Sequence, residues 1–281
     1  MIASSDSLHC MPESDWLARR WWTLERFGLT PGKLPRRVWN RGVPAVLVVS
    51  VPKSGTHLLE RALCLHPQLY RKLVPTLRRK VIDRRWGGVG DLASRLRGGQ
   101  VALAHLRFRE DDPRVLDRHG IRTLFMIRDP RDVLVSLVQF APGRSGFDPG
   151  KVYAAYPGMK ERLRVAIEGR PEDKIPSIAD RLGMFRGWLD SGALVVRFED
   201  LVGASGGGDP ERQLEQLDRI FRHIGVQTGD RKLREIQAKV FSSASPTFRA
   251  GAIGQSRIVF DGELEELFRR QAGELAAEYG Y

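Results

Sequence analysis

The sequence has few cysteines and no long apolar run, and both absences narrow the classes of protein that it can encode. Its two cysteines, Cys10 and Cys64, are far apart and lack Cys or His partners at metal-ligand spacing, so we expect plain thiols rather than disulfides or metal ligands. No stretch approaches the ~18 uninterrupted apolar residues of a membrane span. The N-terminus has no basic region followed by an apolar run, so we expect a cytoplasmic protein.

The sequence has fewer acidic than basic residues. The 281 residues include 46 Lys or Arg and 34 Asp or Glu, which gives a formal net charge of +12. Such a charge attracts anions, and nucleic acid, a phosphorylated small molecule or a solvated basic surface without a specific partner would all fit it. No helix-turn-helix, zinc or aromatic RNA-recognition signature occurs, and the excess charge is spread along the chain. We therefore expect no nucleic-acid partner.

Residues 1–44 form an N-terminal extension that precedes the first convincing strand and is rich in Trp, Arg and Pro. Its apolar residues approximate helical spacing; they are Trp16, Leu17, Trp21, Leu24 and Phe27. We favour a helix that packs this stripe on the core. The alternative is a lid, or a surface that contacts a greasy substrate or a membrane.

Residues 45–281 are expected to form one domain with an α/β fold. Four segments read as apolar strands, namely 45–51, 100–106, 122–127 and 193–198, and helical segments alternate with them. Strands that are apolar throughout are typical of a parallel sheet that is buried on both faces. We therefore predict a central parallel sheet flanked by helices.

The segment VVSVPKSGTHLL, residues 48–59, runs from the first strand through a bend into a helix. Pro52 ends the strand, and Gly55 permits a tight turn. The hydroxyls of Ser54 and Thr56 can bind oxygen atoms or cap the helix, while Lys53 adds a positive charge to the positive end of the helix dipole. The bend predicts a phosphate site. It is not a Walker A loop, whose lysine follows its second glycine, and an ordinary turn is the alternative.

The segment RDPRDVLVS, residues 128–136, forms a second bend of the same kind. Asp129 is a suitable N-cap, Pro130 suits the first helical position, and Asp132 favours the helix start. Arg128 and Ser136 are then free to converge on a second anion beside the first bend, because the guanidinium group binds phosphate with two N–H groups. Alternatively, Arg128 only pairs with Asp129 or Asp132.

Four motifs in this order, VPKSGTHLL, RDPRDVLVS, RFEDL and FRAG, resemble the cytosolic-type sulfotransferases, which use 3′-phosphoadenosine 5′-phosphosulfate (PAPS). The resemblance covers roughly residues 45–281. It implies a P-loop-like three-layer sandwich, and an enzyme that moves the sulfuryl group from PAPS to a hydroxyl or amine acceptor, releases adenosine 3′,5′-bisphosphate and needs no metal.

The resemblance also assigns residues to the donor. The 5′-phosphosulfate loop would comprise Lys53, Ser54, Gly55, Thr56 and His57, and the 3′-phosphate site Arg128, Ser136, Arg249 and Gly251. Phe198 matches an aromatic position near adenine. Lys53 would stabilise charge on the bridging oxygen, and His105 in AHLRF would remove the proton of the acceptor hydroxyl, because a neutral imidazole is a suitable base.

The acceptor and two rival functions stay open at the level of sequence. We expect a small-molecule, glycan or lipid acceptor, of which a small apolar alcohol or phenol is our first choice, and the N-terminal extension can contact a membrane peripherally. One rival is a P-loop kinase or NTPase that uses ATP and magnesium, with Asp129 at the end of a Walker B-like strand. The other is a nucleotide-binding protein without catalytic activity.

Overall fold

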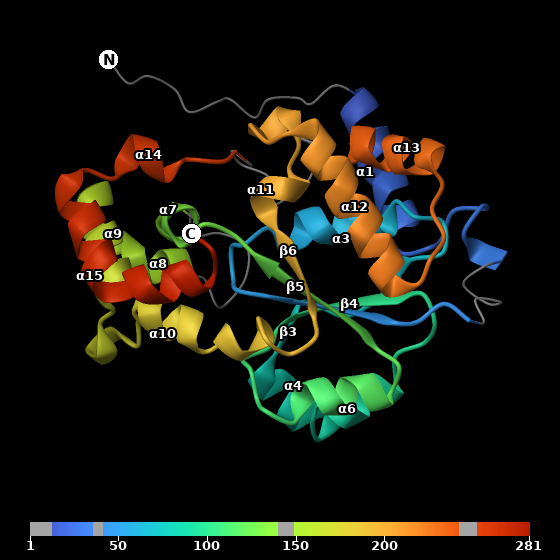
Figure 1. Ribbon diagram of the computed structural model, residues 1–281, viewed down its shortest axis with the longest axis horizontal. Helices are drawn as coiled ribbons and strands as arrows, with labels where there is room; N and C mark the ends of the chain where they lie inside the picture. Colours follow the sequence, from blue (N-terminus) through green and yellow to red (C-terminus); the bar gives the residue numbers. More distant parts are fainter. Residues whose placement is uncertain (1–12, 36–41, 140–148, 242–251) are drawn as a thin grey trace, which may run out of the picture.

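The computed structural model of the protein describes residues 13–35, 42–139, 149–241 and 252–281 (Figure 1). The strands are β1 (Val46–Ser50), β2 (Tyr70–Arg71), β3 (Leu77–Arg78), β4 (Gln100–His105), β5 (Arg122–Ile127) and β6 (Leu194–Arg197). The first helices are α1 (Glu13–Arg26), α3 (Thr56–Cys64), α4 (Arg79–Trp86), α5 (Val89–Ser94), α6 (Asp112–Arg118) and α7 (Pro130–Val138). The later ones are α8 (Pro149–Ala154), α9 (Gly158–Glu168), α10 (Ile178–Gly183), α11 (Phe198–Leu201), α12 (Pro210–Ile224), α13 (Asp230–Val240), α14 (Ser256–Val259) and α15 (Gly262–Glu278), and three 3-10 helices span Pro171–Asp173, Arg186–Trp188 and Ala204–Gly206.

All the strands belong to one parallel sheet, as the sequence predicts. Its order is β2-β4-β1-β5-β6, and the short β3 pairs with the end of β4. The first strand of the domain, β1, therefore lies in the centre, between β4 and β5. Because parallel strands all end at the same edge, the loops that follow them meet there, and ligands of open α/β sheets bind at this edge.

Helices cover both faces of the sheet, which confirms the predicted three-layer α/β fold (Figure 1). Alternate strand residues face opposite sides: Leu47 and Val49 of β1 belong to one core cluster, and Val46 and Val48 to the other. The first cluster includes residues of α4 to α7, α9, α10 and α15, and the second includes residues of α3 and α11 to α13. Within the described part of the chain, no helix is long and apolar enough to cross a membrane.

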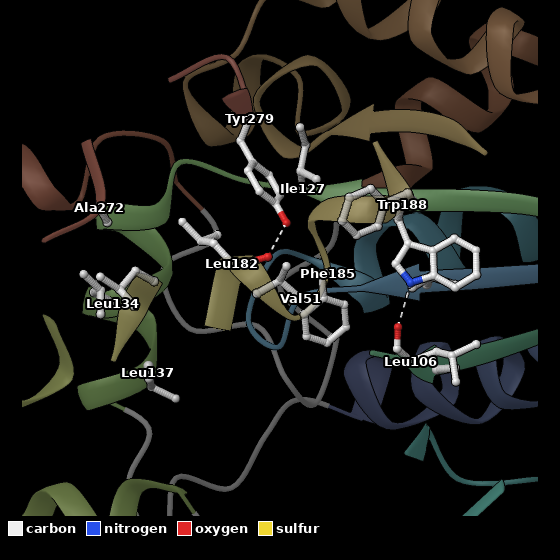
Figure 2. Close-up of a cluster of buried hydrophobic side chains, with 14 of the residues drawn as sticks. Val51, Leu106, Ile127, Leu134, Leu137, Leu182, Phe185, Trp188, Ala272 and Tyr279 are labelled. Carbon is white, nitrogen blue, oxygen red and sulfur yellow. Dashed lines mark hydrogen bonds between the residues drawn. The ribbon is translucent and has the colours of Figure 1, made fainter. Parts of the chain in front are cut away.

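Two buried aromatic side chains donate hydrogen bonds to backbone carbonyls within the first core cluster (Figure 2). The indole N–H of Trp188 donates to the carbonyl oxygen of Leu106 at 2.8 Å, and the hydroxyl of Tyr279 donates to that of Leu182 at 2.8 Å. Both rings thus fill the core without leaving an unsatisfied donor. Leu106 directly follows β4, so Trp188 also fixes the chain where this strand ends.

The N-terminal helix α1 forms as predicted, but it does not pack its whole apolar stripe on the core. Trp21 is 57% exposed and Leu24 is 41% exposed. The helix contacts α3 through polar groups instead. Arg26 forms an ion pair with the buried Glu60, and the guanidinium of Arg61 lies 4.3 Å from the ring centroid of Trp22. The preference for a fully packed stripe is wrong for these two residues.

Candidate active site

The predicted site residues that the structure describes follow three neighbouring strands and the edge strand β6. Lys53 to His57 follow β1, Arg128 follows β5, Phe198 follows β6, and His105 ends β4. The parallel sheet brings them to one edge, which no spacing in the sequence could establish. Ser136 lies on α7, one turn beyond Asp132 on the same helix face. The predicted Arg249 and Gly251 lie outside the described residues.

The loop after β1 has two residues with a left-handed backbone. Lys53 has φ 77° and Gly55 has φ 95°. A lysine at positive φ is uncommon and is often found at functional sites. Position 55 also requires glycine for lack of space, because a Cβ atom there would lie 2.5 Å from Cδ2 of Phe198 and 2.9 Å from Cε of Met126. The loop therefore passes directly against the end of β6.

The hydroxyls of this loop do not cap the helix. The N-cap of α3 is Gly55, which has no side chain that could cap the helix. The hydroxyl of Thr56 lies 2.7 Å from that of Ser50. Ser54 is 1% exposed, and its Oγ atom has no hydrogen-bond partner in the described part of the protein. A buried hydroxyl without a partner, beside the N–H groups of a helix N-terminus, fits an anionic ligand.

His105 is held in one tautomer by the end of β1. Its Nδ1 atom lies 3.0 Å from the carbonyl oxygen of Ser50, and a carbonyl only accepts, so Nδ1 carries the proton. The lone pair is then on Nε2. Burial lowers the pKa of His105 to about 4, and the nearby charges of Arg78, His57 and Lys53 act in the same direction, although the bond to Ser50 opposes them. At neutral pH the ring is a neutral base.

Arg128 is buried between β6 and the segment that starts at residue 252. Its Nη2 atom donates to the carbonyl of Ala252 at 2.8 Å and to Asp132 at 3.2 Å, and its Cζ atom lies 4.2 Å from the ring centroid of Phe198. The pairing with Asp132 that we considered therefore occurs. It does not use the whole guanidinium, because Nε is buried without a partner among the described residues. A second orphaned donor thus lies at the second bend.

Asp132 has a role that the sequence did not reveal. Asp132 lies in the first turn of α7 and Asp129 is the N-cap, which accepts from the backbone N–H of Arg131 at 2.9 Å, and both placements agree with the prediction. The buried carboxylate of Asp132 accepts from the backbone N–H groups of Gly254 and Ser256, each at 2.8 Å. It therefore ties the start of α7 to a segment more than a hundred residues away. A partner at such a separation leaves no local signal.

His57 is attached to a buried carboxylate that the sequence analysis also missed. Its Nδ1 atom lies 2.9 Å from Oε2 of Glu60, which also pairs with Arg26 and Arg71. Burial alone would raise the pKa of Glu60, but the bond to His57 and the charges of the two arginines lower it below the usual value. The carboxylate is therefore ionised and fixes His57 beside Thr56. Its spacing of three from His57 was the only signal in the sequence.

In the kinase alternative Asp129 would bind magnesium. In the structure both of its carboxylate oxygens accept hydrogen bonds from Arg131. One carboxylate oxygen accepts from the backbone N and from Nε of Arg131 at 2.9 and 3.0 Å, and the other accepts from Nη2 at 2.8 Å. Both oxygens thus act within the helix start. This arrangement does not present a carboxylate to a metal-bound nucleotide.

The fold and this edge define an α/β protein in which two adjacent bends each hold a buried polar atom without a partner among the described residues. Residues 44–156 match the family model described as the sulfotransferase domain. The matched range contains the loop after β1, His105 and the second bend. Phe198, Arg249 and Gly251 lie beyond it.

Solved structures share the fold over most of the chain. The mouse sulfotransferase SULT7A1 complexed with PAP gives a TM-score of 0.56 at 16% sequence identity, with 85% of this chain and 89% of that chain covered. Retinol dehydratase in complex with androsterone and the inactive cofactor PAP gives a TM-score of 0.53 at 12% identity, with 87% and 85% covered. No curated protein sequence matches the chain at a significant level.

Proposed function

We propose that this protein is a PAPS-dependent sulfotransferase, which moves the sulfuryl group of PAPS to a hydroxyl or amine acceptor by in-line transfer and releases adenosine 3′,5′-bisphosphate. One observation carries the proposal: the two bends each hold a buried polar atom, Oγ of Ser54 and Nε of Arg128, that has no partner among the described residues. A donor with phosphate groups at both its 5′ and 3′ ends would satisfy both. The PAP in the two solved structures with this fold supports the same choice of nucleotide.

The residues of the first bend suit the 5′ end of this donor. Gly55 lets the backbone approach closely, and Ser54, Thr56 and His57 offer polar groups around the helix N-terminus. PAPS supplies an activated sulfuryl group attached to a phosphate leaving group. Lys53 is proposed to stabilise the negative charge that develops on the bridging oxygen, which is the electrostatic contribution that group transfer needs most.

His105 is proposed to act as the general base. Because Nδ1–H donates to the carbonyl of Ser50, Nε2 is the atom that takes the proton of the acceptor hydroxyl. The bond also fixes the ring orientation, which keeps the base aligned for in-line transfer.

The second bend is proposed to bind the 3′-phosphate. Arg128 and Ser136 would supply donors from the described part of the chain, joined by Arg249 and Gly251. Phe198 remains our proposal for the aromatic near adenine, and its ring also supports the guanidinium of Arg128 at 4.2 Å. A kinase has no use for a 3′-phosphate site, and both oxygens of Asp129 are engaged by Arg131, so the kinase alternative is not favoured.

The sulfotransferase family acts on small molecules, so a small-molecule acceptor is proposed here. A glycan or lipid acceptor and a cytoplasmic location are further proposals.

We also propose that the N-terminal extension contacts an anionic membrane surface. Trp21, Leu24, Leu29 and Leu34 are each more than 40% exposed. The backbone N–H of Leu29 bonds the carbonyl of Leu24, which brings the backbone of these two residues together at the helix end. Residues 16–41 carry seven Lys or Arg and one Glu. Lys33 is buried and Arg26 pairs with Glu60, and the other five would suit anionic lipid.

A thermal-shift titration tests the function. Because a ligand that binds only the folded state raises the apparent stability with its concentration, adenosine 3′,5′-bisphosphate should raise Tm, whereas AMP and ADP with magnesium should not. Lys53→Ala should abolish sulfuryl transfer, and His105→Ala should reduce it strongly while leaving the bisphosphate shift unchanged. Equal or greater stabilisation by ADP with magnesium would overturn the proposal in favour of a kinase.

A further inference from the structure

The carboxyl edge of the sheet continues past His105 to a charged residue that has no part in the proposed donor site. The short strand β3 pairs with β4 in parallel, and Arg78 is the register partner of His105. Register partners on adjacent strands lie about 5 Å apart and their side chains leave the same face of the sheet. Arg78 is exposed, although the residue before it, Leu77, is buried in the core.

The strand order separates the donor from Arg78. The residues proposed to bind the nucleotide follow β1, β5 and β6, whereas Arg78 ends β3 on the opposite side of His105. An in-line transfer requires the acceptor oxygen and the leaving oxygen on opposite sides of the sulfur atom. If the donor lies on the β1 side of His105, an acceptor that approaches from the β3 side satisfies this requirement. Arg78 lies on that side.

The sequence around Arg78 is rich in basic residues. Residues 71–107 contain ten Lys or Arg and two Asp. Of these two, Asp83 is paired with Arg109 at 2.9 Å. Arg79, the neighbour of Arg78, is committed to the protein interior: it pairs with Asp112 and donates to the carbonyl of Arg107 at 2.6 Å. This bond holds the backbone of Arg107, an exposed residue two positions after His105.

We propose that the acceptor carries an oxyanion in addition to its hydroxyl, and that Arg78, assisted by Arg107, binds this oxyanion and sets the acceptor specificity. The inference rests on the proposed sulfotransferase function and replaces our expectation of an apolar alcohol or phenol. A carboxylate, a phosphate ester and a sulfate ester share the chemistry that a guanidinium recognises with two N–H groups. Arg78 determines which acceptor binds, whereas His105 removes the proton of the acceptor hydroxyl.

The test compares acceptors that differ only in charge, with PAPS as donor. The matched pairs are 4-hydroxyphenylacetate with 4-ethylphenol, methyl glucuronide with methyl glucoside, and glycerol phosphate with glycerol. The charged member of at least one pair should have the higher kcat/KM, by about tenfold or more, since a charge-assisted hydrogen bond contributes ~1.5–3 kcal/mol. The pair that responds also identifies whether carboxylate or phosphate is preferred.

Variants of Arg78 separate binding from chemistry. Arg78→Gln should raise KM for the charged acceptor about tenfold while kcat and the kinetics of its neutral partner stay nearly unchanged, and Arg78→Lys should restore part of the loss. Arg84→Gln is the matched control, because Arg84 is also exposed and basic but lies in the last turn of α4. The bisphosphate thermal shift should be the same in all these variants, which shows that they fold. Arg107→Gln, with its backbone contact retained, is the second variant if Arg78→Gln is unstable.

The outcomes are distinguishable from those of the proposed function. If the bisphosphate stabilises the protein but the neutral acceptors are used as well as the charged ones, or no charged acceptor is used, the inference about Arg78 is wrong and the donor site stands. An unchanged charge preference in both arginine variants contradicts it equally. If the bisphosphate does not stabilise the wild-type protein, the proposed function itself fails, and this inference fails with it.

Discussion

At the scale of a single residue, Gly55 lets the first bend pass directly against Phe198. Its left-handed φ of 95° and the 2.5 Å approach of Phe198 to a Cβ atom leave no room for a side chain. We expect Gly55→Ala to lower the free energy of unfolding by about 1–3 kcal/mol and to weaken the bisphosphate thermal shift, because the loop must move away from Phe198. Denaturant unfolding and the thermal-shift titration measure the two effects.

Gly183→Ala is the control for this substitution. Gly183 lies at the end of α10, and a Cβ atom there meets nothing within 4 Å. Alanine at a compatible glycine position leaves stability unchanged or raises it by about 0.4–1 kcal/mol. Equal losses in Gly55→Ala and Gly183→Ala would contradict the role that we assign to the close approach.

His105 makes a second prediction at this scale, through pH. A base must be unprotonated, and burial places the pKa of His105 at about 4 rather than near its usual value. As the pH falls, kcat/KM should therefore stay level through the range where an ordinary histidine titrates, near 6.5, and should fall only as the pH approaches about 4. A pH profile with an acidic limb centred near 6.5 would show that another group, or a differently solvated ring, is the base.

Asp132 acts at the scale of elements, because it joins α7 to the segment from residue 252 onward. Its carboxylate is 1% exposed and binds Arg128, Gly254 and Ser256. Asp132→Ala should lower the free energy of unfolding by about 3–5 kcal/mol, since it leaves a buried cation without its charged partner. It should also weaken bisphosphate binding. Asp132→Asn should do both to a smaller extent, because an amide retains an acceptor.

Asp190→Ala is the control, measured by the same denaturant unfolding. Asp190 pairs with Arg186 on the surface, where its side chain is 67% exposed. Exposed ion pairs contribute about 0–1 kcal/mol, so this loss should be small. A small loss in Asp132→Ala as well would mean that the two backbone N–H groups find other acceptors, and that the segment is not held by α7.

At the scale of the whole molecule, the proposed membrane contact combines the net charge of +12 with the exposed apolar side chains of Trp21, Leu24, Leu29 and Leu34. In a vesicle sedimentation assay, the protein should bind phosphatidylcholine vesicles that contain phosphatidylserine, release as salt rises, and bind pure phosphatidylcholine weakly. Trp21→Ser combined with Leu24→Ser should reduce this binding, because both side chains would enter the interface.

Ile258→Ser is the control for the membrane contact. Ile258 is 80% exposed and lies on α14, far along the chain from the extension. Its substitution should leave vesicle binding unchanged. If the double substitution at Trp21 and Leu24 leaves binding unchanged too, the exposed strip of α1 has another partner and the attraction is only electrostatic.

The sequence by itself determined the architecture and the position of both bends. The apolar segments at 45–51 and 122–127 could only be strands buried on both faces, and Pro52, Gly55, Asp129 and Pro130 act on the backbone of their immediate neighbours. These are local effects, so local patterns report them. The family resemblance then added roles for Lys53 and His105, and these roles remain proposals.

Tertiary structure decided what those bends are attached to. Strand β3 has two residues, too few for any periodicity, yet its register places Arg78 beside His105. In the sequence, Asp132 and Glu60 have no feature that separates them from other helix residues. In the structure, both bind partners that are distant in the sequence. The physical reason is that strand register and buried ion pairs are fixed by packing across the whole domain, whereas turns and helix caps are fixed by the few residues that form them.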